Sequence, residues 1–244
     1  MEQKPLKLVL QEEAAKHWRV IAVCCLRTYQ KLQDLEKVST ALWNHFWQLS
    51  LELEVLEHDL AECINEFAMA VHTHYAEPRD LELKKFAVVY HTDNFYVRVH
   101  KLIENAYGLA ALTVGLDPEQ KPSRGERNFR RRVREALGRA NLHGIRRVLE
   151  EFVANPQIDQ AVTARNRFVH FFREELDWAM LSHADRFQEP DDPMARDVRE
   201  IAQVSQLDIY AEGKREELVR TLTVVREFRD SLLDEASRMD SDKT

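Results

Sequence analysis

Glycine and long apolar runs are scarce in this sequence. The 244 residues include six Gly, and no two of them form a G-x-G cluster. Because P-loop and dinucleotide-binding folds need glycine-rich turns against the phosphates, the sequence excludes nucleotide sites of those two types. No run of about 18 apolar residues occurs, so we expect no transmembrane helix and no membrane association.

Cysteine is also rare, with Cys24, Cys25 and Cys63 as the only three. Their odd number and their lack of metal-ligand spacing argue against both a disulfide framework and a zinc site. No pattern in the chain indicates a metal or a cofactor, and we predict neither. The first 13 residues lack the basic-then-apolar order of a secretory signal. These features together predict a reduced, cytoplasmic protein.

Charge is unevenly distributed along the chain. Formal net charge is -7, from 35 Lys and Arg against 42 Asp and Glu, yet the segment from Lys121 to Arg147 holds ten basic and two acidic residues. Nine of the ten are Arg, whose planar fork suits phosphate better than a Lys point charge does. The segment therefore predicts a local site for a polyanion, with Arg130, Arg131 and Arg134 as RNA-binding candidates. The alternative is a solvated helix face that pairs with acidic neighbours.

Apolar residues recur at steps of three and four along most of the chain, which is typical of amphipathic helices, and no segment of useful length alternates with period two. The expected helices are Leu10 to Leu32, Leu42 to Phe67, Asp93 to Thr113, Ser123 to Ala140, Ile145 to Phe152, Ile158 to Ala179 and Leu218 to Leu232. The predicted fold class is all-α: an up-and-down bundle of long antiparallel helices with smaller helices appended.

We expect one compact domain overall. Residues 1–80 would supply long N-terminal helices that pack on a core bundle formed by residues 81–239, which includes the C-terminal helix, and residues 240–244 would form a frayed tail. Ser39 and Thr40 are predicted to cap the helix with heptad spacing, and Pro78 to mark its end. Asp93 is predicted to cap the next helix and Gly115 to close it.

A charged residue interrupts the apolar stripe that begins at Ile158. Arg165 stands there, and an unpaired Arg that faces a core would cost several kcal/mol, so a partner must hold it. A purely structural interpretation pairs Arg165 with one of the many carboxylates. Five helical steps place Arg165 and His170 about 140° apart around the axis, whereas Asn166 and His170 share a face, with Arg173 beside them.

The string Arg165-Asn166-x-x-x-His170, on a late helix of an all-α chain, resembles the signature of HEPN domains: Arg, a polar residue, a short spacer and His. The stretch from Asp93 to Leu102 is also similar to the long helix that precedes this motif in one branch of the family. The resemblance covers approximately residues 86–184. Members of the family dimerise so that the two motif helices face each other across a groove, which implies a HEPN-like bundle and a homodimer here.

The resemblance implies a metal-independent endoribonuclease with one composite site built from two copies of Arg165 and His170. An RNA strand carries its own nucleophile in the 2'-OH, so the protein needs only to move protons and to stabilise phosphate charge. His170 would transfer the protons, Arg165 would bind the phosphate oxygens, and Asn166 would orient His170. RNA would be the substrate, with Arg173 added to the basic segment as a binding residue, and the setting would be stress, defence or toxin–antitoxin biology.

One position departs from a toxin subgroup of the family. That subgroup carries a Tyr two positions after the His, which a nucleotidyltransferase antitoxin modifies, whereas this chain has Phe172 and lacks the hydroxyl. An antitoxin that acts in another way, or another protein, is a further candidate partner. HEPN domains without activity also exist. The alternative function is therefore a catalytically silent HEPN scaffold or protein-binding module, docked through its heptad helix and acidic surface.

Overall fold

The structure is a computed structural model that describes residues 6–72, 78–118, 126–170 and 193–241, with side chains for residues 16–71, 84–118, 128–166, 207–239 and 241. Within these ranges the chain forms helices and no strands, which confirms the all-α prediction. The helices are α1 (Leu6–Leu32), α2 (Thr40–His72), α3 (Pro78–Thr113), α4 (Glu126–Arg139), α5 (His143–Ala154), α6 (Pro156–His170) and α8 (Pro193–Ser241). Over the searched part of the chain, none of these helices has the length and apolar character needed to span a bilayer.

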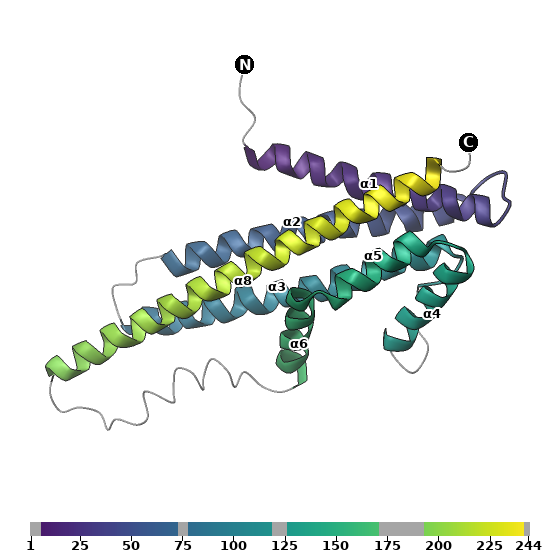
Figure 1. Ribbon diagram of the computed structural model, residues 1–244. Helices are drawn as coiled ribbons and strands as arrows, with labels where there is room; N and C mark the ends of the chain where they lie inside the picture. Colours follow the sequence, from purple (N-terminus) through teal and green to yellow (C-terminus); the bar gives the residue numbers. More distant parts are fainter. Residues whose placement is uncertain (1–5, 73–77, 119–125, 171–192, 242–244) are drawn as a thin grey trace, which may run out of the picture.

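The long helices lie side by side in a bundle (Figure 1). Helices α1, α2 and α3 alternate in direction, and α8 runs along them in the same direction as α1 and α3. Helix α2 packs against α1, α3 and α8. The shorter α4 and α5 lie at one end of α3, and α6 runs across the bundle axis rather than along it. A crosswise helix presents its far end away from the long helices.

The hydrophobic core lies where the long helices and α5 meet. Trp18 of α1, Phe46 of α2 and Phe95 of α3 are fully buried in it. The ring of Phe152 in α5 stacks on Phe228 of α8 with centroids 4.0 Å apart, and Trp18 packs against the same Phe228 ring at 6.3 Å. Aromatic pairs at such distances add stability beyond the area that they bury. These ring contacts stabilise the packing of α5 against α8 and of α8 against α1.

Several helix ends are where the sequence places them. The hydroxyl of Ser39 accepts a hydrogen bond from the backbone N–H of Leu42 at 3.2 Å, which caps α2 as predicted. Gly115 has φ of 75°, a conformation that favours glycine, and it lies two residues after the last residue of α3, where the sequence predicts the helix to close. Helix α5 ends at Ala154, two residues beyond the expected Phe152 and directly before Asn155 and Pro156.

The predicted start of the third helix is wrong. Helix α3 begins at Pro78 rather than at Asp93, which lies inside it. Proline is well suited to the first position of a helix, where its missing N–H is not needed. The first half of α3 cannot be recognised from apolar spacing, because a charged residue is buried there and aromatic residues are exposed. Lys84 is buried, whereas Phe86 and Tyr90 are 56% and 53% exposed.

Helix α8 is also longer than the stripe from Leu218 to Leu232 that predicts it. It begins at Pro193, and its first half includes Ile209, which is 75% exposed, so the apolar spacing is weak there. Two further expectations, the cap at Ser123 and the helical stripe from Phe172 to Ala179, lie outside the described residues.

The expected division after residue 80 falls within α3. Buried residues of α1 and α2, on its N-terminal side, belong to the same hydrophobic cluster as those of α3, α5, α6 and α8. The independent folding of residues 81–239 stays a prediction.

Candidate functional site

Helix α6 carries the Arg165-Asn166 motif. The side chain of Asn155 accepts a hydrogen bond from the backbone N–H of Gln157 at 3.0 Å, which fixes the start of the helix. Ile158 and Ala161 are buried, and the helix packs against α3, α5 and α8. Residues four apart lie on one face of a helix, so Arg165 lies on the same face as the buried Ala161, one turn further along α6. Its side chain is partly buried.

The structure brings Arg165 and Asn166 together. Arg165 Nη1 donates a hydrogen bond to Asn166 Oδ1 at 3.0 Å, and Asn166 is exposed. Over the described part of the chain, no carboxylate forms an ion pair with Arg165, and its buried Nε has no hydrogen-bond partner. The purely structural interpretation, in which a carboxylate holds Arg165, therefore finds no partner among these residues.

The hydrogen bond gives Asn166 a partner within the described residues, since its Oδ1 accepts from Arg165. The predicted role of Asn166 in orienting His170 stays a prediction, because the side chain of His170 is outside the described set. An amide that accepts from a guanidinium restrains the direction in which the remaining N–H donors of the arginine point. The hydrogen bond therefore restrains the side chain of Arg165.

The other two motif candidates are placed less fully. His170 is the last residue of α6, and its side chain is outside the described set. Arg173 lies outside the described residues altogether. The roles of both residues stay predictions.

Helix α4 divides the basic segment into two faces. Its buried residues Phe129, Val133 and Leu137 face the bundle. Arg130 and Arg134 flank this inward face and are partly buried, whereas Arg131 is exposed. The three arginines chosen from the sequence for RNA binding therefore do not share one surface.

The two flanking arginines have partners in the bundle. The guanidinium carbon of Arg130 lies 5.5 Å from the centre of the Tyr107 ring, and Arg134 Nη1 lies 3.9 Å from Glu150 Oε1. Burial lowers the pKa of Arg130, while neighbouring Tyr107 and Glu104 oppose that change. Burial also raises the pKa of Tyr107, against the influence of the two arginines. A positive charge that is already engaged in this way attracts a distant polyanion less than a solvated one does.

Two arginines that were not among the predicted RNA-binding residues are more exposed than Arg130 and Arg134. Arg132 and Arg139 are exposed on the outward face of α4 beside Arg131, and neither forms an ion pair with a described residue. A helical projection that takes Phe129, Val133 and Leu137 as the inward face would have found them.

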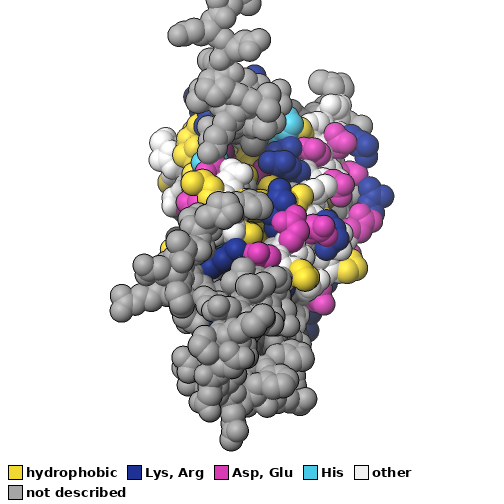
Figure 2. Space-filling view, turned by 90° about the vertical axis from the view of Figure 1, so that its left-hand side faces the viewer, with side chains coloured by type: hydrophobic (Ala, Val, Ile, Leu, Met, Phe, Trp, Pro, Cys, Tyr) yellow, Lys and Arg dark blue, Asp and Glu magenta, His cyan; other side chains and the backbone are white. Residues whose placement is uncertain are grey.

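Acidic neighbours offset part of the remaining basic charge. Arg131 lies 3.8 Å from Glu135, and Arg147 donates to Glu235 at 2.9 Å. Charges of both signs are also mixed elsewhere: on the left-hand side of the molecule of Figure 1, Figure 2 shows Lys and Arg side chains interspersed with Asp and Glu side chains. We refer to the three exposed arginines of this helix, Arg131, Arg132 and Arg139, as the outward basic face of α4.

Two further observations bear on the chemistry of the chain. No group of three or more His, Cys, Asp or Glu side chains is arranged to hold a metal ion among the residues searched. Comparison with family models, with curated proteins and with solved structures found no match.

Proposed function

We propose that this chain is a HEPN-family endoribonuclease that cleaves RNA without a metal ion, through a composite site formed by Arg165 and His170 of two copies of the chain. The observation that carries the proposal is the hydrogen bond between Arg165 and Asn166. It pairs the two adjacent residues of the motif with each other, in a part of the chain where no described carboxylate neutralises the arginine.

The chemistry follows from the residue types. One His170 takes the proton of the RNA 2'-OH, and the 2'-oxygen attacks the adjacent phosphorus. The bond from phosphorus to the 5'-oxygen breaks, and the second His170 supplies a proton to that leaving oxygen. Histidine titrates near neutral pH, so both protonation states are accessible. The products are a 2',3'-cyclic phosphate and a 5'-hydroxyl end.

Arg165 would stabilise the charge that develops on the phosphate oxygens. A guanidinium presents parallel N–H donors that match two phosphate oxygens, and donors that are already oriented need no reorganisation during the reaction. Nη1 of Arg165 donates to Asn166 Oδ1, and this hydrogen bond restrains the plane of the guanidinium group. This supports a phosphate-binding role for Arg165 and a positioning role for Asn166.

The geometry of one helix favours a dimeric site. Arg165 and His170 diverge by about 140° around the α6 axis, so one copy does not easily aim both at one phosphate. Two copies of α6 that face each other across a two-fold axis would supply an arginine from one chain and a histidine from the other. The crosswise position of α6 leaves its far end clear of the long helices (Figure 1).

The direct test is cleavage of a defined RNA by the purified chain in EDTA. We expect 2',3'-cyclic phosphate ends, and no cleavage where the scissile 2'-OH is replaced by hydrogen. His170→Ala and Arg165→Ala should each lower the rate by about 10² to 10⁴ while the helical content is kept. Arg167→Ala, at a spacer position of the motif on the same helix, is the matched control. Cleavage that survives the double substitution of Arg165 and His170 would overturn the proposal.

An exposed apolar stripe on α2 favours the second candidate function, a catalytically silent protein-binding module. Trp43, Leu51 and Val55 are 42%, 36% and 54% exposed, and Trp43 stacks on Trp47 at 6.0 Å. These residues lie at steps of four along the heptad helix, a spacing that a partner helix can match. A wild-type chain that cleaves no RNA, and whose association state changes with Trp43→Gln and Val55→Gln, would favour this function.

A further inference from the structure

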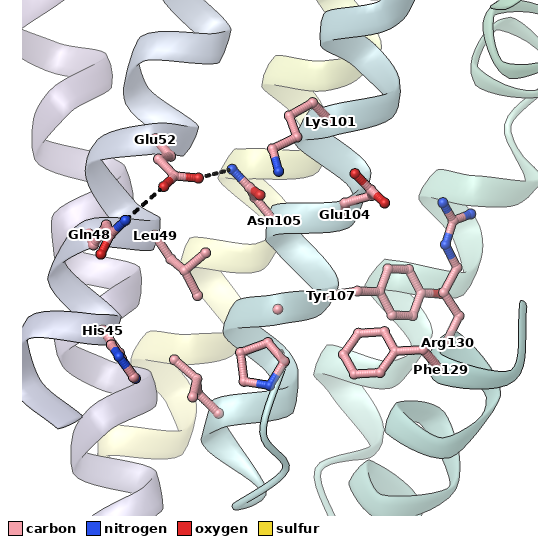
Figure 3. Close-up of a pocket in the computed structure, with 13 residues that line it drawn as sticks. His45, Gln48, Leu49, Glu52, Lys101, Glu104, Asn105, Tyr107, Phe129 and Arg130 are labelled. Atoms are coloured by element: carbon pink, nitrogen blue, oxygen red, sulfur yellow. Dashed lines mark hydrogen bonds between the residues drawn. The ribbon is translucent and has the colours of Figure 1, made fainter. Parts of the chain in front are cut away.

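A pocket of about 250 Å³ lies between α2, α3 and α4, away from the Arg165 motif (Figure 3). Helix α2 contributes a carboxylate and an amide, α3 contributes charged and aromatic side chains, and α4 closes the far side. The residues that line it are His45, Gln48, Leu49, Glu52, Lys101, Glu104, Asn105, Tyr107, Gly108, Leu112, Pro118, Phe129 and Arg130. Such a mixture of an apolar body and a few convergent polar groups is typical of small-molecule sites.

Two amides hold the carboxylate of Glu52 in one orientation. Gln48 Nε2 donates to Glu52 Oε1 at 3.2 Å, and the buried Asn105 Nδ2 donates to Glu52 Oε2 at 2.9 Å. Both carboxylate oxygens are therefore anchored, from two different helices. A carboxylate fixed in this way loses little conformational entropy when it binds a ligand.

Each Glu52 oxygen still has capacity to accept. An ionised carboxylate offers about four lone-pair positions, and the two amides use one on each oxygen. The group that best matches two parallel acceptors is a planar fork of N–H donors, as in a guanidinium. A single ammonium would satisfy one of these positions and leave the other to water.

Charges of both signs continue across the pocket. Figure 3 shows Glu52 on one side and Arg130 on the opposite side, with Lys101 and Glu104 of α3 between them. Lys101 forms no ion pair with any residue that the structure describes. The lining therefore carries charges of both signs, of which Arg130 also contacts the Tyr107 ring, and a ligand with both charges complements it better than an anion alone.

The apolar part of the lining limits the shape of the ligand. Leu49 of α2, Leu112 of α3 and Gly108, which lacks a side chain, belong to the lining. Leu49 Cδ1 lies 3.6 Å from the position that a β-carbon on Gly108 would take. An apolar wall beside the charged groups suits an unbranched aliphatic chain.

We propose that this pocket binds a free α-amino acid with a guanidinium side chain, of which arginine is the type. The guanidinium would pair with Glu52, the aliphatic stem would pass Leu49, and the carboxylate would lie against Lys101 and Arg130. The α-ammonium would then face Glu104. This binding does not depend on RNA cleavage and goes beyond the proposed function.

The test is isothermal titration calorimetry of the 244-residue chain with arginine and two analogues. Citrulline has the same shape with a neutral end group, and agmatine lacks the carboxylate. We expect saturable arginine binding with a dissociation constant of about 1 mM or below, and affinity roughly 10- to 100-fold lower for citrulline, because a charge-assisted pair is lost. Agmatine should also bind more weakly, since Lys101 and Arg130 then lack their partner.

Three variants test whether arginine binds in this pocket or elsewhere on the protein. Glu52→Gln keeps the size of the side chain and should lower arginine affinity roughly 10-fold or more, and Lys101→Met should weaken arginine but leave agmatine unchanged. Glu151→Gln, at an exposed carboxylate outside the pocket, is the matched control and should bind as wild type. Circular dichroism checks that each variant is folded.

Three results would overturn the proposal: no heat of binding for arginine at 10 times the expected dissociation constant of about 1 mM, equal affinity for citrulline, or unchanged affinity in Glu52→Gln. A mononucleotide or a peptide with a C-terminal arginine that binds more tightly than arginine would also reject a free amino acid as the ligand. RNA cleavage is measured separately, so failure here leaves the proposed function standing.

Discussion

Glu57 of α2 and Arg229 of α8 form a buried ion pair, with Glu57 Oε1 2.5 Å from Arg229 Nη1. The side chains are 3% and 11% exposed, and Trp18 Nε1 of α1 donates to the other carboxylate oxygen at 2.9 Å. One carboxylate thus joins three long helices at the centre of the bundle. Groups that are buried and mutually satisfied are costly to separate, because removal of one leaves the other charged and unpaired.

We therefore predict that Glu57→Gln lowers the free energy of unfolding by about 3–5 kcal/mol. Arg226 also lies 3.6 Å from Glu57 but is 46% exposed, so Arg226→Gln should cost at most about 1 kcal/mol. Urea unfolding followed by circular dichroism measures both. Similar small losses in the two variants would mean that the buried pair contributes no more than a surface one.

The second prediction compares two glycines. The carboxylate of Glu235 occupies the space in which a β-carbon on Gly144 would stand, whereas nothing lies within 4 Å of that position at Gly213. Glu235 is held by Arg147 and Arg238 at 2.9 and 3.0 Å. Gly144→Ala should therefore destabilise the protein by about 1–3 kcal/mol, and Gly213→Ala, inside α8, should stabilise it by about 0.5–1 kcal/mol. Changes of the same sign in thermal unfolding would contradict this difference.

The third prediction concerns acid sensitivity. Burial lowers the pKa of His91 although Glu66 Oε2 lies 3.3 Å from its Nδ1. Between the lowered pKa and the ordinary value of about 6.5, the unfolded chain binds more protons than the folded one, so stability falls as the pH falls. His91→Gln should shrink the loss of stability between about pH 8 and about pH 5.5. An equal loss of stability over this pH range in His91→Gln and in wild type would contradict the prediction.

The fourth prediction concerns the outward basic face of α4. Replacement of Arg131, Arg132 and Arg139 with Gln should weaken RNA binding and lower the salt dependence of the binding constant by about 0.7 per lost phosphate contact. Arg130→Gln with Arg134→Gln should affect affinity less and lower thermal stability, because these side chains contact Tyr107 and Glu150. Fluorescence anisotropy over a range of salt concentrations measures the slope. A slope unchanged in the triple variant would show that RNA does not follow α4.

The fifth prediction follows from the proposed two-fold site. Sedimentation should show a dimer at the concentrations at which RNA is cleaved, and addition of excess His170→Ala chain to wild type should lower the activity as mixed dimers form. Arg167→Ala chain, mixed in the same way, should not lower it. Full activity of a monomer would rule out the composite site.

Much of the fold could be predicted because its signals are local. The steps from Leu42 to Phe67, the cap at Ser39 and the glycine at Gly115 each depend on residues within a turn or two. The Arg165-Asn166 pair could be singled out for the same reason, since a charge interrupts an apolar stripe. The start of α3 could not be predicted, because Lys84 replaces an apolar residue on its inward face.

What the sequence by itself determined is thus the set of helices, the faces that most of them bury and the motif on α6. Only the tertiary structure decided which polar groups meet: Lys84 pairs with Asp208 across 124 positions, and Glu52 is held by Asn105 of another helix. It also decided that Arg130 and Arg134 of α4 meet Tyr107 and Glu150. The periodicity of apolar residues predicts which face of a helix is buried. It does not predict which residue of a second helix a buried polar group will contact, because the position of that second helix is set by packing.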